Sequence, residues 1–169
     1  MEAISARVVS GTVAGLHRKP EVPGERGLPK PSVPSLQVSA RGADGDFNRW
    51  RSQERAGDEA MALLLIPMEN IEELRREGWP IRLGDLGENV TTRGIPNLQF
   101  SPPCRLRVGE ATVEISKPCD PCDNLLLLPY VGRSRGAEFL RTMIGRRGWY
   151  ARVVVPGEIR VGDSIRSLP

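Results

Sequence analysis

The chain has 169 residues, of which 39% are hydrophobic, 5% aromatic and 27% charged, with 18 glycines and 15 prolines. This length predicts one domain over residues 1–169 with a single core, and the glycine and proline content argues against a coiled coil or an all-helical bundle. The longest apolar run, residues 61–66, is far shorter than the roughly 20 residues of a membrane span. No signal-peptide pattern opens the sequence, so we expect a cytoplasmic protein without a membrane partner.

The charge is mildly basic, with 24 lysines and arginines against 21 acidic residues, a formal net charge of +3. Lysine occurs only at Lys19, Lys30 and Lys117, so the basic residues are mostly arginine, whose fork suits phosphate and carboxylate groups. The net charge is too small to predict a nucleic-acid partner. An arginine-rich surface nevertheless leaves open a non-catalytic module that binds RNA or a protein through a basic rim.

Short extended segments separated by turns predict a mainly β protein. We expect strands at 5–16, 33–40, 89–92 and 149–155, a hairpin at 104–116, and a turn with a last strand in 156–168. Residues 61–66 indicate a buried strand or the start of a helix, and 17–32 and 41–58 indicate loops. Helices are expected at 68–78, where acids precede bases, and at 136–147, with a stripe of Phe139, Leu140, Met143 and Ile144. Several short strands with two short helices predict a β-barrel or sandwich.

The motif Cys119-Asp120-Pro121-Cys122 is the first candidate for chemistry. Three cysteines without an export signal favour reduced thiols over a disulfide framework. A zinc site would need ligands beyond His17 and Cys104, and a thioredoxin-type pair would need a helix that Pro129 interrupts. Burial of both sulfurs as core filler is disfavoured by the polar flanking residues. One exposed, reactive thiolate is therefore a further interpretation of the motif, in addition to a zinc site, a redox pair and two buried sulfurs.

Two further segments are candidate ligand contacts. Residues 84–94 combine glycines with neutral hydrogen-bonding side chains, which suits a ring or a phosphate held without a protein charge, although a turn with an edge strand has the same composition. Lys30 and the segment 45–49 place a lysine and an arginine in polar loops, where they could bind an anion. The sequence lacks a P-loop, a G-x-S-x-G elbow and an H-E-x-x-H helix, so nucleotide-binding and common hydrolase classes have no support.

Together these segments resemble the MOSC family, named for the C-terminal domain of molybdenum cofactor sulfurase, and are most similar to its small stand-alone bacterial members. The blocks that carry the resemblance are Gly27–Lys30, Gly42–Asp46, Gly84–Gly94 and Lys117–Cys122. The Gly-Glu-Asn-Val-Thr-Thr-x-Gly run and the late Pro-Cys are its specific parts. The resemblance spans roughly residues 5–165 and implies a strongly bent β-barrel with a few short helices.

The resemblance also implies a reactive cysteine at the mouth of the barrel, which falls on Cys122. Family members use it as a ligand of the molybdenum in the molybdenum cofactor, or are proposed to carry a persulfide on it; pyridoxal phosphate binding is a further family-level association. An electron-transfer reductase or a cysteine desulfurase would be the partner. Many members have a histidine where this chain has Asn48, so no proton-transfer role is carried over to that position. The residues expected to bind the cofactor are Lys30, Asp46, Asn48, Arg49, Glu88, Asn89, Thr91 and Thr92.

Overall fold

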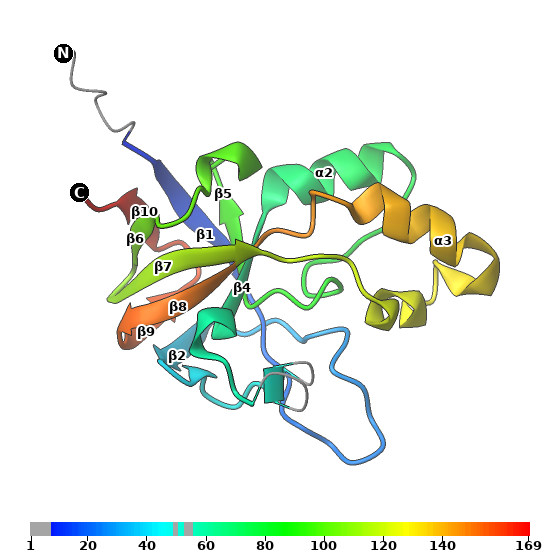
Figure 1. Cartoon of the computed structure of the whole chain (residues 1–169), viewed down its shortest axis with the longest axis horizontal. Coiled ribbons are helices and arrows are strands. Elements are labelled where there is room, and N and C mark those ends of the chain that lie inside the picture. The colour runs from blue at the N-terminus through cyan, green and yellow to red at the C-terminus, as the bar shows by residue number, and fades with distance from the viewer. Residues whose placement is uncertain (1–7, 49–50, 53–55) are drawn as a thin grey trace.

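Seven strands close into a mixed barrel, which confirms the mainly β prediction (Figure 1). The computed structural model describes residues 8–48, 51–52 and 56–169; Arg49, one of the expected site residues, lies outside them. All barrel pairs are antiparallel except the parallel pair β4–β5. In their order around the barrel the strands are β1 (Ser10–Leu16), β10 (Ser164–Ser167), β6 (Arg105–Val108), β7 (Ala111–Pro118), β8 (Trp149–Val155), β4 (Leu63–Pro67) and β5 (Val90–Arg93).

Breaks in strand register give the barrel its bends. The pairing of β1 with β5 shifts between Val13 and Gly15, and the pairing of β7 with β8 shifts at two places. Each such bulge bends a strand and increases its twist. A separate three-stranded sheet joins β3 (Gly42–Ala43), β2 (Ser35–Ser39) and β9 (Gly157–Arg160).

Strand β4 is buried on both faces. Leu63 and Leu65 belong to the cluster inside the barrel, whereas Leu64 and Ile66 belong to a second cluster beneath the helices. This double burial explains the continuous apolar run, because a strand covered on both sides has no reason to alternate. The strand alternative for 61–66 is therefore the correct one, with a short 3-10 helix, η1 (Glu59–Met61), leading into it.

Two α-helices, α2 (Met68–Arg76) and α3 (Gly132–Met143), lie on the same side of the barrel (Figure 1). Helix α2 matches the predicted position, with Ile71 and Leu74 buried on its inner face. Helix α3 begins four residues earlier than predicted and ends before Ile144, which is 67% exposed instead of joining the apolar stripe. The helix stops there because Gly145 adopts a positive φ of 74°.

The C-terminal segment corrects the prediction of a single last strand. Residues 156–168 contain β9 in the small sheet and β10 in the barrel, so the chain crosses from one sheet to the other. Two more 3-10 helices are η2 (Asn97–Gln99) and η3 (Asp123–Leu127). No helix in the described ranges is long and apolar enough to cross a lipid bilayer.

Candidate functional site

A cleft of about 620 Å³ opens beside the end of β7, the start of β8 and the loops around residues 28, 47 and 120. It brings together three of the predicted site residues, Lys30, Asn48 and Cys122, which come from segments far apart in the sequence. The side chains that line it are mixed in character. They are Arg26, Leu28, Lys30, Phe47, Asn48, Met61, Leu64, Lys117, Pro118, Asp120, Pro121, Cys122, Asp123, Asn124, Arg147 and Tyr150.

Cys122 presents an exposed thiol to this cleft. Its Sγ accepts a hydrogen bond from Nη1 of Arg147 at 3.1 Å, and the same nitrogen donates to the Asp120 carbonyl at 2.9 Å. Nη2 of Arg147 donates to the Leu86 carbonyl at 3.3 Å. The guanidinium thus ties the cysteine loop to the segment that precedes β5.

The other cysteine of the motif has a different environment. Cys119 is buried, and its backbone N–H donates to the Gly148 carbonyl at 3.0 Å. Burial raises the pKa of the Cys119 thiol and also raises the pKa of the neighbouring Tyr150 hydroxyl. A buried, protonated thiol is a poor nucleophile and a poor metal ligand, so Cys122 is the sulfur available for chemistry.

Lys30 is held at the cleft by a buried network. Its Nζ lies 2.6 Å from Oδ2 of Asp46, and the two side chains are only 5% and 7% exposed. Nδ2 of Asn89 donates to the same Oδ2 at 2.8 Å, and the backbone N–H of Lys19 donates to Oδ1 at 2.9 Å. Asp46 and Asn89 do not line the cleft themselves, so they can influence it only by holding the Lys30 side chain in place.

The remaining predicted contacts lie behind the cleft wall. Glu88, Thr91 and Thr92 have no exposed surface and do not line the cavity. Strand β5 pairs with both β1 and β4, so it is an interior strand, not the edge strand of the alternative interpretation. Oε1 of Glu88 accepts the Gly84 N–H at 2.6 Å, which closes the turn that precedes the strand. A role of these three side chains toward a cofactor stays a prediction.

Gly84 is a glycine for a specific reason. Its φ is +92°, and a Cβ at this position would strike the backbone carbonyl of Lys30. The carbonyl of Gly84 accepts the Lys30 N–H at 3.0 Å, so this close approach fixes the backbone of the lysine that lines the cleft.

Glu88 should make stability depend on pH. Burial raises its pKa from 4.5 to about 7, against the opposing effect of the Gly84 N–H. The folded chain thus holds this proton more tightly than the unfolded chain, so the stabilisation is full below pH 4.5 and is lost as the pH rises through about 7. Glu88→Gln keeps an acceptor for Gly84 but does not titrate. The free energy of unfolding of the wild type minus that of the variant should fall by roughly 3 kcal/mol across this range.

Urea unfolding at several pH values measures this difference. Burial, followed by the charge of Lys30, lowers the pKa of His17 to about 4. That stabilisation runs in the opposite direction, being lost as the pH falls from 6.5 to 4, but it is common to both proteins and cancels in the difference. A difference that stays constant from pH 4.5 to 8 would contradict the assignment to Glu88.

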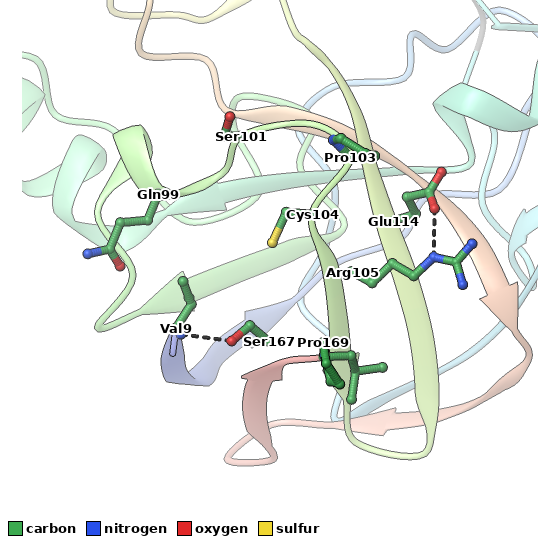
Figure 2. Close-up of a pocket in the computed structure, with 10 residues that line it drawn as sticks. Val9, Gln99, Ser101, Pro103, Cys104, Arg105, Glu114, Ser167 and Pro169 are labelled. Atoms are coloured by element: carbon green, nitrogen blue, oxygen red, sulfur yellow. Dashed lines mark hydrogen bonds and ion pairs between the residues drawn. The ribbon is translucent and has the colours of Figure 1, made fainter. Parts of the chain in front are cut away.

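A second cavity of about 680 Å³ contains none of the predicted site residues. It lies beside Pro169 at the C-terminal end and includes Cys104 beside the ion pair of Arg105 and Glu114 (Figure 2). Burial raises the pKa of Cys104, which is half-buried. In the part of the chain that the structure describes, no group of three or more His, Cys, Asp and Glu side chains is arranged to hold a metal ion. The zinc alternative therefore gains no support.

The arginine-rich surface is interleaved with acids. Several arginines outside the cleft pair with glutamates, which offsets part of the positive charge. The pairs are Arg93–Glu72, Arg105–Glu114, Arg135–Glu138, Arg146–Glu77, Arg152–Glu114 and Arg160–Glu158.

Sequence reasoning missed Arg147, because the predicted helix over 136–147 would place it on an ordinary helical turn. A signal was present in the two flanking glycines, Gly145 and Gly148, which both adopt a positive φ. They indicate an irregular connection before β8 rather than helix. The sequence predicts Tyr150 only as a strand residue, and the structure shows that it also lines the cleft.

Comparisons with known proteins agree with this architecture. YuaD from Bacillus subtilis superposes with a TM-score of 0.76 at 19% identity, covering 96% of this chain and 99% of its own. YiiM from Geobacillus stearothermophilus gives a TM-score of 0.72 at 22% identity, covering 94% and 75%. YiiM from Escherichia coli gives 0.64 at 20% identity, covering 94% and 70%. No curated protein has a sequence that matches this chain.

At these identities the structural likeness establishes the fold alone. The sequence itself adds the family, because the model of the MOSC domain matches residues 52–166. This range covers more than half of the chain and includes the segment before β5, the cysteine motif and Arg147. The chain therefore belongs to the MOSC domain family.

Proposed function

We propose that this MOSC protein binds the molybdenum cofactor in the cleft, with the sulfur of Cys122 as the protein's ligand to the metal. The observation that carries the proposal is the exposed Cys122 thiol, which lines the cleft and lies 3.1 Å from a buried guanidinium. A soft sulfur ligand suits a transition metal.

The donor set of the cleft fits a pterin that carries a phosphate. Lys30 and Arg26 supply cations for the phosphate, and Asn48 and Asn124 supply neutral donors and acceptors for a ring. The apolar side chains of Leu28 and Phe47 among the lining residues offer a surface for the flat part of such a molecule. When bound, the cofactor supplies two-electron redox chemistry at its metal.

In this proposal, four residues of the site have distinct roles. Cys122 holds the metal, Lys30 holds the anionic group, and Asp46 with Asn89 keeps the Lys30 ammonium in place. The cleft is open to solvent at Cys122, so a small substrate and a partner reductase can reach it. We propose reduction of N-hydroxylated bases or related N–O compounds, with electrons from that reductase.

A second role for Cys122, as a sulfur carrier, is favoured by the same exposed sulfur. In this version its thiolate attacks the outer sulfur of a persulfide on a cysteine desulfurase. The new S–S bond forms on Cys122, the S–S bond of the donor breaks, and the donor cysteine leaves as a thiolate. Arg147 is placed to balance the negative charge of the carried sulfur.

Metal and mass analysis separate the two roles. The full chain is purified from a host that makes the cofactor and from the same host with cofactor synthesis disabled. Elemental analysis and native mass spectrometry should find about one molybdenum and one pterin per chain in the first preparation only, with reduction of an N-hydroxylated base by a chemical electron donor. Added sulfur without molybdenum in both preparations would support the carrier role and overturn the first. Neither addition in either preparation would overturn both.

A further inference from the structure

The cations of the cleft differ in how their charge is balanced. Lys30 lies 2.6 Å from Asp46, and Lys117 lies 3.2 Å from Asp58. Arg26 is exposed to water. Arg147 is only 6% exposed, and no carboxylate of the described residues lies within 4.0 Å of it. It is the one lining cation, among those the structure describes, that is buried without a carboxylate.

A buried cation without an anion is costly, and a guanidinium cannot lose its proton in a protein. The charge of Arg147 is therefore permanent. Two backbone carbonyls satisfy part of its hydrogen bonding, Asp120 at 2.9 Å and Leu86 at 3.3 Å, but neither carries a formal negative charge. The remaining partner is the sulfur of Cys122, on the cleft side. The arrangement thus favours a negatively charged group next to this sulfur.

We propose that Arg147 is a positioning and selectivity residue, which fixes the Cys122 sulfur at the cleft and makes that sulfur react preferentially with negatively charged partners. This inference rests on the proposed function only in taking Cys122 as the reacting sulfur. The carbonyl contacts pin the cysteine loop to the segment before β5, and the charge selects small anions over neutral molecules of the same size.

Two alkylating reagents of nearly equal size test this selectivity. Iodoacetate is an anion and iodoacetamide is neutral; in both reactions the Cys122 thiolate displaces iodide, forming an S–C bond as the C–I bond breaks. The ratio of the two rates does not depend on how much of the thiol is ionised, because both reagents use the same thiolate. Rates at Cys122 are measured by peptide mass spectrometry at one pH and low salt, on full-length protein from a host that does not make the cofactor.

The iodoacetate-to-iodoacetamide ratio in the folded wild type should exceed that of the urea-unfolded chain, measured by the same method, by about 5-fold, the effect of one charge roughly 4 Å away in water. In Arg147→Gln, which can still donate to a carbonyl, the ratio should fall several-fold. Arg147→Lys, which keeps the charge, should restore most of it. A residue that only held the loop in place would change both rates together and leave the ratio unchanged.

Arg146→Gln is the matched control, because the neighbouring Arg146 pairs with Glu77 on the helical side at 2.6 Å and does not line the cleft. Its ratio should equal that of the wild type. The proposal is overturned if folded Arg147→Gln keeps the wild-type ratio, or if Arg146→Gln lowers it equally. If Arg147→Gln does not fold, a wild-type ratio no higher than that of the unfolded chain overturns it as well. None of these results depends on molybdenum, so the failure of this proposal is distinguishable from that of the proposed function.

Discussion

Cys122→Ser is expected to lose its molybdenum, with the metal content falling at least about 10-fold relative to the wild type when both are made in a cofactor-producing host. A serine hydroxyl is a hard, neutral oxygen that stays protonated at neutral pH, so it replaces a soft anionic ligand with a weak one. The substitution is nearly isosteric, and the side chain is exposed. The fold should therefore be unaffected, and metal per chain is the quantity to measure.

Cys104→Ser and Cys119→Ser are the controls for this experiment. Cys104 lines the other cavity, and Cys119 is buried behind the cleft, so both variants should keep the metal of the wild type. Unchanged melting temperatures would confirm that each variant is folded. A Cys122→Ser protein that retains one molybdenum per chain would contradict the assignment of this sulfur as the ligand. Loss of metal in Cys119→Ser alone would transfer the role to the buried thiol.

Asp46→Ala is expected to lower the free energy of unfolding by about 3–5 kcal/mol, because removing one partner leaves a buried charge without compensation. The ammonium of Lys30 is 5% exposed and would have no carboxylate beside it. The Lys19 N–H would also lose its acceptor, and Asn89 would lose one of its two. Urea unfolding at neutral pH, monitored by tryptophan fluorescence, measures the change.

Glu25→Ala removes a carboxylate from the Lys19–Glu25 pair, which is at the surface, with the glutamate 56% exposed. Its cost should be below about 1 kcal/mol, the usual range for exposed pairs. Adding Lys30→Met to Asp46→Ala should recover much of the loss, since the unpaired charge is then gone. Equal costs for Asp46→Ala and Glu25→Ala would show that the cleft is more hydrated than its burial indicates.

The sequence predicts strands well where one face of the strand is buried and the other is exposed to solvent. In the hairpin of β6 and β7, the buried Leu106, Val108, Val113 and Ile115 alternate with Arg105, Arg107 and Glu114, which are less buried, so alternation identifies the hairpin although Thr112 is also buried. Alternation of apolar and polar residues cannot distinguish strand from helix at 61–66, because neither face of β4 is exposed to solvent. The sequence predicts one last strand where the structure has β9 and β10, since nothing local marks a chain that leaves one sheet for another.

The cysteine loop was predictable from its own residues, and its surroundings were not. The polar and proline flanks predict that neither sulfur of the motif lies in the core; this is correct for the exposed Cys122 and wrong for Cys119, which is buried in the cluster beneath the helices. Arg147 lies 25 residues further along the chain, and its contact with the sulfur depends on how α3 ends and β8 begins. The sequence also predicts a ligand surface at Thr91 and Thr92, and the structure shows both side chains buried and outside the cleft lining. Their strand pairs with β1 on one side and β4 on the other, a burial that the local sequence does not reveal.

The shared position of β4 also links the cleft to the rest of the molecule. Leu64 lines the cleft and belongs to the helical cluster, while its neighbours Leu63 and Leu65 fill the barrel. The two clusters are consequently not separate cooperative units, because neither can open without exposing this strand. A ligand held against Leu64 is thereby coupled to global unfolding, so its occupancy protects the whole chain and not merely a local loop.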